Sequence, residues 1–419
     1  MSKETVDFLV IGGGVIGLSL AIEAKRRFPK SRVRLIEKER ACGLHASGRN
    51  SGVVHAGFYY SADSLKARFT REGNERLTNY CRDRGLRINR CGKLVVAKTV
   101  SEHRGLEELF KRGVQNGVEV YLVSRDEACD IEPQVRTVDK ALYSPTTSSV
   151  DPAEVMKSFT EDAIGNGVQV LTETMFLGRD KDTIITNRGK VCPGYTINAA
   201  GLYADRVARA FGFSQDYRIL PFKGLYLCSK ETPPLIRTHI YPVPDLNNPF
   251  LGVHFTLGAY NEVKIGPTAI PALWREHYAG FSGFRLDECV DIVGRECAML
   301  FRNDFGFRSL AASELRKCTR SRMIALASNL VGNVGKIEAA RWGKSGIRAQ
   351  LVNIRERKLE MDFHYEGDQT SFHVLNAVSP AFTCAVPFSE FLFDEIERIR
   401  RHASRSMPGS QLHLNNGSS

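Results

Sequence analysis

The sequence predicts two domains: an α/β domain built on a parallel sheet, and an α+β domain with a mixed or antiparallel sheet. Three observations lead to this prediction. The chain has 419 residues, roughly two to three times the ~150 residues of a typical domain. Its first forty residues follow a strand, glycine turn, helix and strand pattern, which returns after residue 150. Between these segments, Lys93–Tyr143 and Pro221–Pro271 alternate strand-like runs with proline and aromatic residues.

The first unit lies within residues 7–37. Asp7–Ile11 is a short apolar run that is typical of a buried parallel strand. Val15–Arg27 repeats apolar residues at helical spacing and ends in three basic residues, which suit a helix C-terminus. Pro29 stops this helix, and Arg32–Glu37 regains strand character. These elements form a βαβ unit.

The glycines between the first strand and the helix match the G-x-G-x-x-G pattern. Gly12 permits the tight turn, Gly14 lets a pyrophosphate approach the helix N-terminus, and Gly17 lets helix and strand pack closely. Glu37 follows twenty positions after Gly17, where a carboxylate can bind an adenosine ribose. The pattern predicts a Rossmann-like dinucleotide-binding domain, with either NAD or FAD as ligand.

Later segments extend this domain. Asp151 and Pro152 suit the start of a helix that runs to Gly165, and Tyr195–Ala199 is another apolar strand that leads into a helix near residues 204–211. We assign residues 1–90, 145–220 and 341–400 to the dinucleotide domain and residues 91–144 and 221–340 to the second, substrate domain. We expect a disordered tail at residues 402–419.

Composition excludes several classes of protein. Lys and Arg exceed Asp and Glu by 58 to 47, a net charge of +11 that is spread along the chain. The one basic cluster, at residues 398–405, contains no aromatic residue, which argues against nucleic-acid binding. The ten cysteines form no C-x-x-C pair, so we expect neither a metal site nor a disulfide framework. With no signal peptide or spanning segment in sight, we expect a cytoplasmic protein.

The segment His45–Tyr60, HASGRNSGVVHAGFYY, resembles the flavin-dependent L-2-hydroxyglutarate dehydrogenase/oxidase family within the D-amino-acid-oxidase-like FAD superfamily. Further motifs follow in the order of that family: Leu65–Ala67, Cys91–Leu94, Ala200–Arg206, Pro221–Gly224, Ile240–Asp245, Phe250–Thr256, Gly346–Gln350 and Asn376–Ala381. The sequence departs from the family pattern at Arg49, Lys344, Ser345, Val378 and Phe382, and the match is faint from about residue 285 to 340.

The resemblance implies a D-amino-acid-oxidase-like flavoprotein in which FAD takes a hydride at N5 and L-2-hydroxyglutarate becomes 2-oxoglutarate. The residues expected to hold FAD are Gly12, Gly14, Gly17, Glu37, Lys38, His45, Ser47, Asn50, Ser51, Gly52, Ala200, Gly201, Gly346, Ser379, Pro380 and Ala381. Two alternatives stay open: an amine, amino-acid or glycerol-phosphate oxidase on the same scaffold, and a non-catalytic flavin-binding partner protein.

The substrate site needs a base for the hydroxyl proton and polar groups for two carboxylates. His55 and His254 are the candidate bases, with His55 preferred because its loop also holds the cofactor. His55 also resembles the histidine through which related amine dehydrogenases tether flavin covalently. Arg348 can bind one carboxylate through two hydrogen bonds. The remaining candidates are Lys223 or Arg49 for the distal carboxylate, with Tyr60 and Tyr241 as hydroxyl donors.

The expected partners are a small hydroxy acid and an electron acceptor, which is oxygen, a quinone or an electron carrier. The basic balance of the chain also favours weak attraction to anionic surfaces. We therefore include weak peripheral association with a membrane among the expectations.

Overall fold

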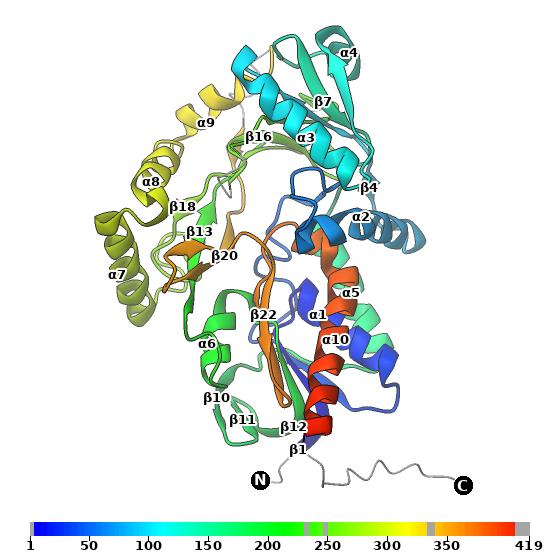
Figure 1. Ribbon diagram of the computed structural model, residues 1–419, viewed down its shortest axis with the longest axis vertical. Helices are drawn as coiled ribbons and strands as arrows, with labels where there is room; N and C mark the ends of the chain where they lie inside the picture. The colour runs from blue at the N-terminus through cyan, green and yellow to red at the C-terminus, as the bar shows by residue number, and fades with distance from the viewer. Residues whose placement is uncertain (1–3, 230–233, 246–249, 333–339, 407–419) are drawn as a thin grey trace.

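The computed structural model describes residues 4–229, 234–245, 250–332 and 340–406. Its lower part in Figure 1 is a sheet in the order β10-β11-β12-β1-β2-β9, and β23 pairs with β12 and β22. The bounds are β1 Glu4–Ile11, β2 Val33–Ile36, β9 Gln169–Leu171, β10 Phe176–Asp180, β11 Thr183–Thr186, β12 Gly189–Asn198, β22 His364–Gly367 and β23 Ser371–Asn376. β1 runs parallel to both β2 and β12, as expected for a βαβ unit.

Four helices form a layer beside this sheet. They are α1 Val15–Arg27, α2 Leu65–Asp83, α5 Pro152–Gly165 and α10 Ala381–Ser406. Helices α1 and α5 contact the strands of the sheet, α10 packs on α1, and α2 packs on α10. The predicted limits of α1 are confirmed. Asp151 caps α5 as predicted, because its Oδ1 accepts a hydrogen bond from the Ala153 N–H at 2.7 Å. The predicted tail starts too early, since α10 continues to Ser406; the rest of the tail lies outside the described residues.

The second large sheet has the order β19-β14-β17-β16-β15-β5-β7-β6 and forms the upper part of Figure 1. Its strands are β5 Lys93–Val96, β6 Tyr121–Ser124, β7 Lys140–Ser144, β14 Leu227–Ser229, β15 His239–Pro242, β16 His254–Leu257, β17 Val263–Gly266 and β19 Arg341–Trp342. Neighbouring strands are antiparallel apart from the parallel pair β5 and β15. The 3₁₀ turn η1 Val100–Glu102 leads into α3 His103–Gln115, which lies with α4 Arg125–Ile131 on this part.

Two smaller sheets connect these parts. One pairs β13 Tyr217–Gly224 with β20 Gly346–Asn353, flanked by β18 Ile270–Pro271 and β21 Lys358–Leu359. The other consists of β3 Val53–Val54, β8 Ser148–Val150 and β4 Ile88–Asn89. The turn η2 Gly201–Tyr203 and helix α6 Ala204–Arg209 follow β12. β20 pairs with β13 along its full length. The domain boundary that we placed between residues 220 and 221 falls within β13, so the assignment of residues to two domains stays a prediction.

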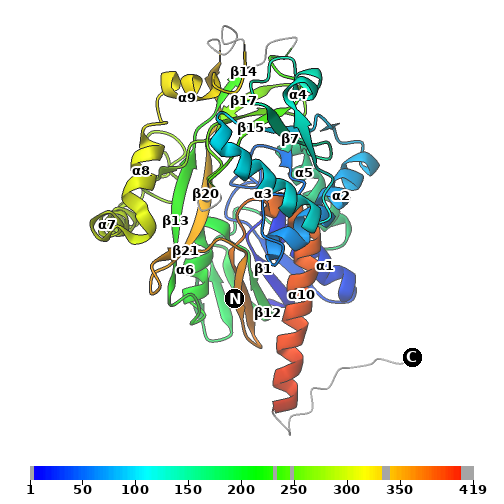
Figure 2. The same ribbon diagram turned by 45° about the horizontal axis from the view of Figure 1, so that its top comes forward.

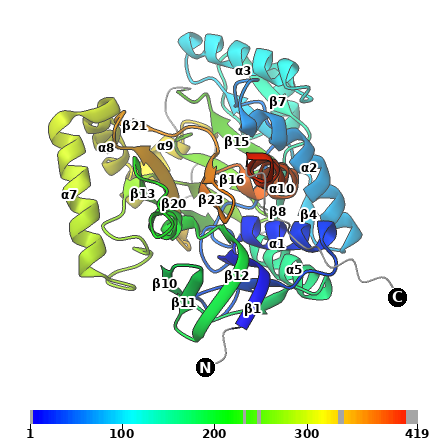
Figure 3. The same ribbon diagram turned by 60° about the horizontal axis from the view of Figure 1, so that its bottom comes forward.

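Residues 286–327 form three helices that the sequence analysis did not anticipate. They are α7 Leu286–Arg302, α8 Phe307–Leu315 and α9 Arg320–Ala327, with the turn η3 Asp304–Gly306 between the first two. Figures 1, 2 and 3 all place α7 and α8 at the edge of the molecule, away from α1 and α10. This is the stretch in which the family motifs are faint. Figure 2 also shows how far α10 extends beyond the sheet that it covers.

Candidate active site

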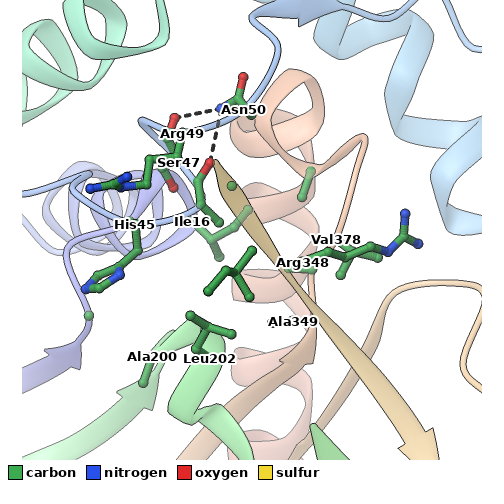
Figure 4. Close-up of a pocket in the computed structure, with 18 of the residues that line it drawn as sticks. Ile16, His45, Ser47, Arg49, Asn50, Ala200, Leu202, Arg348, Ala349 and Val378 are labelled. Carbon is green, nitrogen blue, oxygen red and sulfur yellow. Dashed lines mark hydrogen bonds between the residues drawn. The ribbon is translucent and has the colours of Figure 1, made fainter. Parts of the chain in front are cut away.

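A cavity of about 920 Å³ runs from the N-terminus of α1 to the ribbon of β13 and β20. Figure 4 shows His45 at one end, Arg348 and Val378 at the other, and Ala200 and Leu202 along one wall. Of the residues predicted for the site, these line the cavity: Gly12, Gly14, Glu37, Lys38, His45, Ser47, Arg49, Asn50, Ser51, His55, Ala200, Gly201, Tyr241, His254, Gly346, Arg348, Ser379, Pro380 and Ala381. The fold therefore brings together motifs that lie more than three hundred positions apart in the sequence.

The glycine turn leaves space for a dinucleotide at the N-terminus of α1. Gly12 has φ +110°, and a Cβ there would lie 2.5 Å from the Ala199 carbonyl oxygen. A Cβ on Gly17 would lie 1.9 Å from the Gly12 carbonyl oxygen, so this glycine serves helix packing. A Cβ on Gly14 would meet only the Ser47 hydroxyl, at 3.1 Å. This geometry fits a pyrophosphate bound by backbone N–H groups.

Glu37 fixes the loop that follows β2. Its Oε2 accepts a hydrogen bond from the Gly13 N–H at 2.7 Å, and its Oε1 accepts one from the Glu39 N–H at 2.9 Å. Nearby, the Val15 N–H donates to the Ser47 hydroxyl at 3.0 Å. The carboxylate thus lines the cavity beside the helix N-terminus, where an adenosine ribose is expected to lie.

Lys38 ties this end of the cavity to the segment after β18. Its Nζ donates to Glu276 Oε1 at 2.5 Å and also to Glu39. Burial lowers the pKa of Lys38, but the two carboxylates outweigh that effect and raise it. His45 joins the cluster, with its Nδ1 2.9 Å from the Tyr278 hydroxyl. The ammonium ion therefore pairs with both acids at the edge of the cavity.

The loop from His45 to Gly57 is held by its own side chains. Asn50 Nδ2 donates to the carbonyl oxygens of Ala46 at 3.3 Å and Ser47 at 2.7 Å, the dashed bonds in Figure 4. Its Oδ1 accepts from the Gly52 N–H at 2.8 Å. Asn50 therefore shapes the loop along which the cofactor is expected to lie.

His55 lies in the wall of the cavity. Its Nε2 lies 3.4 Å from the Ser379 hydroxyl, and its backbone N–H donates to Thr383 Oγ1 at 3.1 Å. Within the described part of the chain, its Nδ1 is buried without a hydrogen-bond partner. Burial, followed by the charge of Lys93, lowers the pKa of His55 well below its usual value. The imidazole is neutral, but no hydrogen bond fixes its tautomer.

His254 lies on β16 and has a defined tautomer. Its Nδ1 lies 2.8 Å from the Gly252 carbonyl oxygen, which can only accept, so Nδ1 carries the hydrogen and Nε2 can accept a proton. Its ring stacks on Tyr241, with ring centroids 3.6 Å apart. Burial, followed by the charge of Lys93, lowers the pKa of His254 to about 3. His254 is therefore a neutral acceptor in the cavity wall.

Arg348 lies on β20 in register with Phe222 on β13. Its Nε donates to Gln350 Oε1 at 3.0 Å, and its guanidinium carbon lies 5.6 Å from the centroid of the Phe250 ring. Burial lowers the pKa of Arg348 to about 10, so the group keeps its charge at neutral pH. A half-buried guanidinium beside an aromatic ring is suited to binding a carboxylate.

Four predicted residues do not line the cavity: Gly17, Gly52, Tyr60 and Lys223. Lys223 follows the cavity residue Phe222 on the same strand, and successive strand side chains point to opposite faces. Tyr60 lies close enough to Arg348 for that charge to act on its pKa, which burial raises. A Cβ on Gly52 would lie 2.3 Å from the Val150 carbonyl oxygen, so it serves the packing of β8. Their binding roles stay predictions.

Sequence reasoning missed other residues of the cavity wall, among them Tyr226, Phe250, Glu276 and Thr383. Glu276 had no local signal, because its partner Lys38 lies more than two hundred positions away. Phe250 begins one of the family motifs and could have been selected from it. Thr383 lies two positions after the Ser379–Ala381 motif and contacts the backbone of His55.

The fold and the cavity define the class of protein: a two-domain flavoprotein oxidoreductase. The family model of FAD-dependent oxidoreductases matches residues 7–386, and the chain belongs to that family. FAD is therefore its cofactor, and the glycine turn and loop 45–57 are the features that fit it. Among the described residues, no helix combines the length and apolar character required to cross a bilayer.

Curated relatives carry one activity in their names. The chain is 34% identical over 423 residues to the mitochondrial L-2-hydroxyglutarate dehydrogenase of Bos taurus, covering 95% of this chain and 90% of that protein. It is 33% identical over 421 residues to the human mitochondrial enzyme, with 95% and 90% covered. It is 31% identical over 420 residues to the L-2-hydroxyglutarate dehydrogenase of Escherichia coli K12, with 97% and 96% covered.

Solved structures share the fold at lower identity. The FAD-bound L-α-glycerophosphate oxidase of Mycoplasma pneumoniae has a TM-score of 0.72 at 23% identity, covering 95% of each chain. Glycine oxidase of Geobacillus kaustophilus has a TM-score of 0.70 at 18% identity, covering 94% of this chain and 95% of that one. These structures show the D-amino-acid-oxidase-like fold. The substrate has to be inferred from the residues of the site.

Proposed function

We propose that this enzyme oxidises L-2-hydroxyglutarate to 2-oxoglutarate. The observation that carries the proposal is the presence of a half-buried arginine, Arg348, and two neutral histidines in the wall of one cavity. The relatives named for this activity, at 31–34% identity, support the same substrate. When bound, FAD supplies the acceptor for the hydride that leaves C2.

The residues of the chain have separate tasks in this reaction. Arg348 binds the C1 carboxylate through its planar fork and so holds C2 in one orientation. His254 Nε2 takes the hydroxyl proton, in preference to His55, because the Gly252 carbonyl fixes its tautomer. The two carboxylates of the substrate raise the pKa of this histidine when they bind nearby. Phe222 and Phe250 line the same end and exclude water.

The distal carboxylate needs a second partner. Of the two cations predicted for it, Arg49 lines the cavity and Lys223 does not. The Arg49 guanidinium lies 4.3 Å from the centroid of the Tyr278 ring, and its Nε donates to the Leu44 carbonyl oxygen at 2.8 Å. Its remaining N–H groups include donors that a carboxylate can use. The Tyr278 hydroxyl also contacts His45, at the opposite end of the cavity from Arg348, so we assign neither cation to the distal carboxylate.

An anaerobic reduction screen tests the proposed substrate. Purified holoenzyme is mixed with L-2-hydroxyglutarate, D-2-hydroxyglutarate, sarcosine, glycine, D-alanine or glycerol 3-phosphate, and bleaching of the flavin band is followed. We expect rapid bleaching by L-2-hydroxyglutarate alone. Faster reduction by an amine or by glycerol 3-phosphate would contradict the proposed substrate and favour the alternative oxidase class. A flavin that none of these compounds reduces would support the non-catalytic alternative.

The acceptor and the membrane contact are also proposals. Helix α7 and the loop before it expose Phe281, Leu286, Val290 and Phe301, with side chains 66–84% accessible. Exposed arginines 285, 308 and 316 lie in the same helical segment. Apolar and basic side chains together fit an anionic lipid surface, where a quinone would accept the electrons. Co-sedimentation with phosphatidylglycerol vesicles, but not with phosphatidylcholine vesicles, is the expected result, and equal recovery with both would contradict it.

A further inference from the structure

Lys93, on β5, is buried in the substrate domain, and its Nζ has no hydrogen-bond partner among the described residues. In that part of the chain no carboxylate lies within ion-pair distance of it. Its neighbours are aromatic rings: Nζ lies 4.2 Å from the centroid of Tyr241, 5.2 Å from that of Tyr59 and 5.7 Å from that of Phe58. A methionine would fill this space at a lower desolvation cost, so packing alone does not require an amine.

Strand order places Lys93 in a row with His254. Lys93 pairs with His239 in the parallel ladder of β5 and β15, so both side chains share one face of the sheet with Tyr241. Ile240 pairs with Phe255, which puts Tyr241 beside His254 on β16. Because β15 lies between β5 and β16, Lys93 and His254 flank the Tyr241 ring from opposite sides. We call these three residues the His254–Tyr241–Lys93 row.

We propose that Lys93 is a positioning residue of the oxidation: through the Tyr241 ring it holds His254 against the substrate cavity, and its charge adds to the effect of burial in favouring the neutral, proton-accepting forms of His254 and His55. The proposal rests on the proposed function in requiring a histidine base. Lys93 does not line the cavity, so it acts through its neighbours and not by contact with substrate.

The electrostatics agree with this geometry. Burial lowers the pKa of His55, His239 and His254, and in each case the charge of Lys93 is the next cause. Burial also lowers the pKa of Lys93 itself, to about 7. As the pH falls, Lys93 is therefore protonated before the histidines and opposes their protonation in the range where a base would be lost.

The groups around Lys93 come from every element packed against it. The titratable ones are Cys91 just before β5, His239 and Tyr241 on β15, His254 on β16, and His55 and Tyr59 on the loop after β3. β7 contributes Ser144 in register, and α3 contributes the apolar residues Leu106 and Leu109 to the same cluster. Burial raises the pKa of Cys91 to about 12, so this thiol stays neutral.

The test is the pH profile of the limiting rate of flavin reduction, measured by stopped flow in the holoenzyme. Lys93→Met removes the charge and keeps the volume. We expect the acid limb of the profile, the pH range in which the rate falls as the base is protonated, to move up by about one pH unit. This is the scale of the effect of one nearby charge in a protein interior. Lys93→Arg restores a cation over the rings, and its acid limb should return to the wild-type position or below it.

Lys66→Met is the matched control. Lys66 is also buried with a pKa lowered to about 7 by burial, but its Nζ donates to the Met361 carbonyl oxygen at 2.5 Å. The Lys66→Met variant should have the same acid limb as the wild-type enzyme. An acid limb that is unmoved in Lys93→Met, or that rises as far in Lys66→Met, would overturn the proposal. If Lys93→Met loses FAD, Lys93→Arg decides the question, because an upward shift in that variant contradicts a role of charge.

The profile is recorded with whichever compound of the screen reduces the wild-type flavin fastest. If that compound is not L-2-hydroxyglutarate, the proposed substrate fails while the inference on Lys93 is still tested. If the acid limb is unaffected with L-2-hydroxyglutarate as the fastest reductant, the inference fails and the proposed function stands.

Discussion

Arg348, His55 and His254 show how much the role of a side chain depends on the hydrogen bonds that it makes. Arg348 donates from Nε to Gln350, which orients the guanidinium. His254 is fixed through Nδ1, whereas the Nδ1 of His55 lacks a partner within the described chain. At this scale the sequence identifies the residue types, and the structure distinguishes between them through hydrogen bonds that no motif encodes.

Arg348→Lys keeps a charge and loses the planar fork. We expect kcat/KM for L-2-hydroxyglutarate to fall. The expected loss of transition-state binding energy is on the order of 2–5 kcal/mol, the scale for a disrupted charge contact. Steady-state kinetics at equal flavin content measure the loss. Lys223→Met, on the opposite face of β13, should change kcat/KM far less. An unchanged kcat/KM in Arg348→Lys would show that Arg348 stabilises the sheet and does not bind the substrate.

His254→Ala should slow flavin reduction by about 10²–10⁴-fold, the range for loss of a general base. His55→Ala is the paired variant and should have a smaller effect if it shapes the loop and does not take the proton. Both should retain FAD, which the absorbance ratio of flavin to protein checks. If only His55→Ala slows reduction, His55 is the base; if neither does, the proton goes elsewhere.

Among the elements, those with local signals were predictable from the sequence. The limits of α1 follow from its apolar stripe and Pro29, and α5 follows from Asp151 and Pro152. The parallel pairing of β5 with β15 could not be predicted, because it joins strands nearly 150 positions apart. Helices α7 to α9 were missed because the family motifs are faint in their stretch, although Thr319 caps α9. Lys93 was quoted only as part of a motif, since its importance arises from that long-range pairing.

The glycine turn before α1 offers a prediction at the scale of the element. Gly14→Val should fold and lose FAD, because the nearest atom to a Cβ there is the movable Ser47 hydroxyl, while the branched side chain fills the pyrophosphate space. Gly17→Val should not fold, since its Cβ would clash with the Gly12 backbone. Circular dichroism and flavin content separate the two outcomes. Stoichiometric FAD in Gly14→Val would contradict this geometry.

Helix α7 buries Glu296, and burial raises the pKa of this carboxyl to about 8. In the unfolded chain Glu ionises near pH 4.3. Between about pH 4 and pH 8 the unfolded state therefore loses a proton that the folded state keeps, and stability falls as the pH rises. Glu296→Gln removes this penalty. We expect the variant to be more stable by about 1–3 kcal/mol at pH 8 and nearly equal to wild type at pH 4.

Urea unfolding of the Glu296→Gln variant at both pH values measures this difference. Glu288→Gln on the same helix is the control, because Glu288 accepts from Arg206 at 3.1 Å and from the Arg275 N–H at 3.1 Å. That variant should be less stable than wild type. A Glu296→Gln variant with no gain at pH 8 would show that the carboxyl has a partner in solution.

At the scale of the molecule, one buried ion pair joins the helix after β12 to the segment after β18. Arg275 donates to both carboxylate oxygens of Asp205, at 2.8 and 2.9 Å, and both side chains are buried. Burial raises the pKa of Asp205, but Arg275 and the hydrogen bonds outweigh this and lower it. The pair thus contributes stability above the pKa of an unfolded Asp, near 3.9, and loses it as the pH falls through the lowered value.

Asp205→Ala leaves the guanidinium buried without its carboxylate. We expect a loss of about 3–5 kcal/mol in the free energy of unfolding at pH 7, measured by urea denaturation. Arg209→Met removes only a partly exposed partner of the same carboxylate and should cost about 0–1 kcal/mol. Equal losses in the two variants would mean that the buried pair has no special weight in joining the two segments.

The ribbon of β13 and β20 also matters for how such an enzyme can be redesigned. Phe222 and Arg348 line the cavity from one antiparallel pair, whereas the glycine turn and Glu37 adjoin strands of another sheet. Substitutions on the cavity face of the ribbon can therefore change which acid is accepted while the cofactor stays bound. An inserted or deleted residue on either strand would instead exchange its inner and outer faces at once. Directed evolution of new substrate preferences should thus gain from point changes in this ribbon and lose from changes in its length.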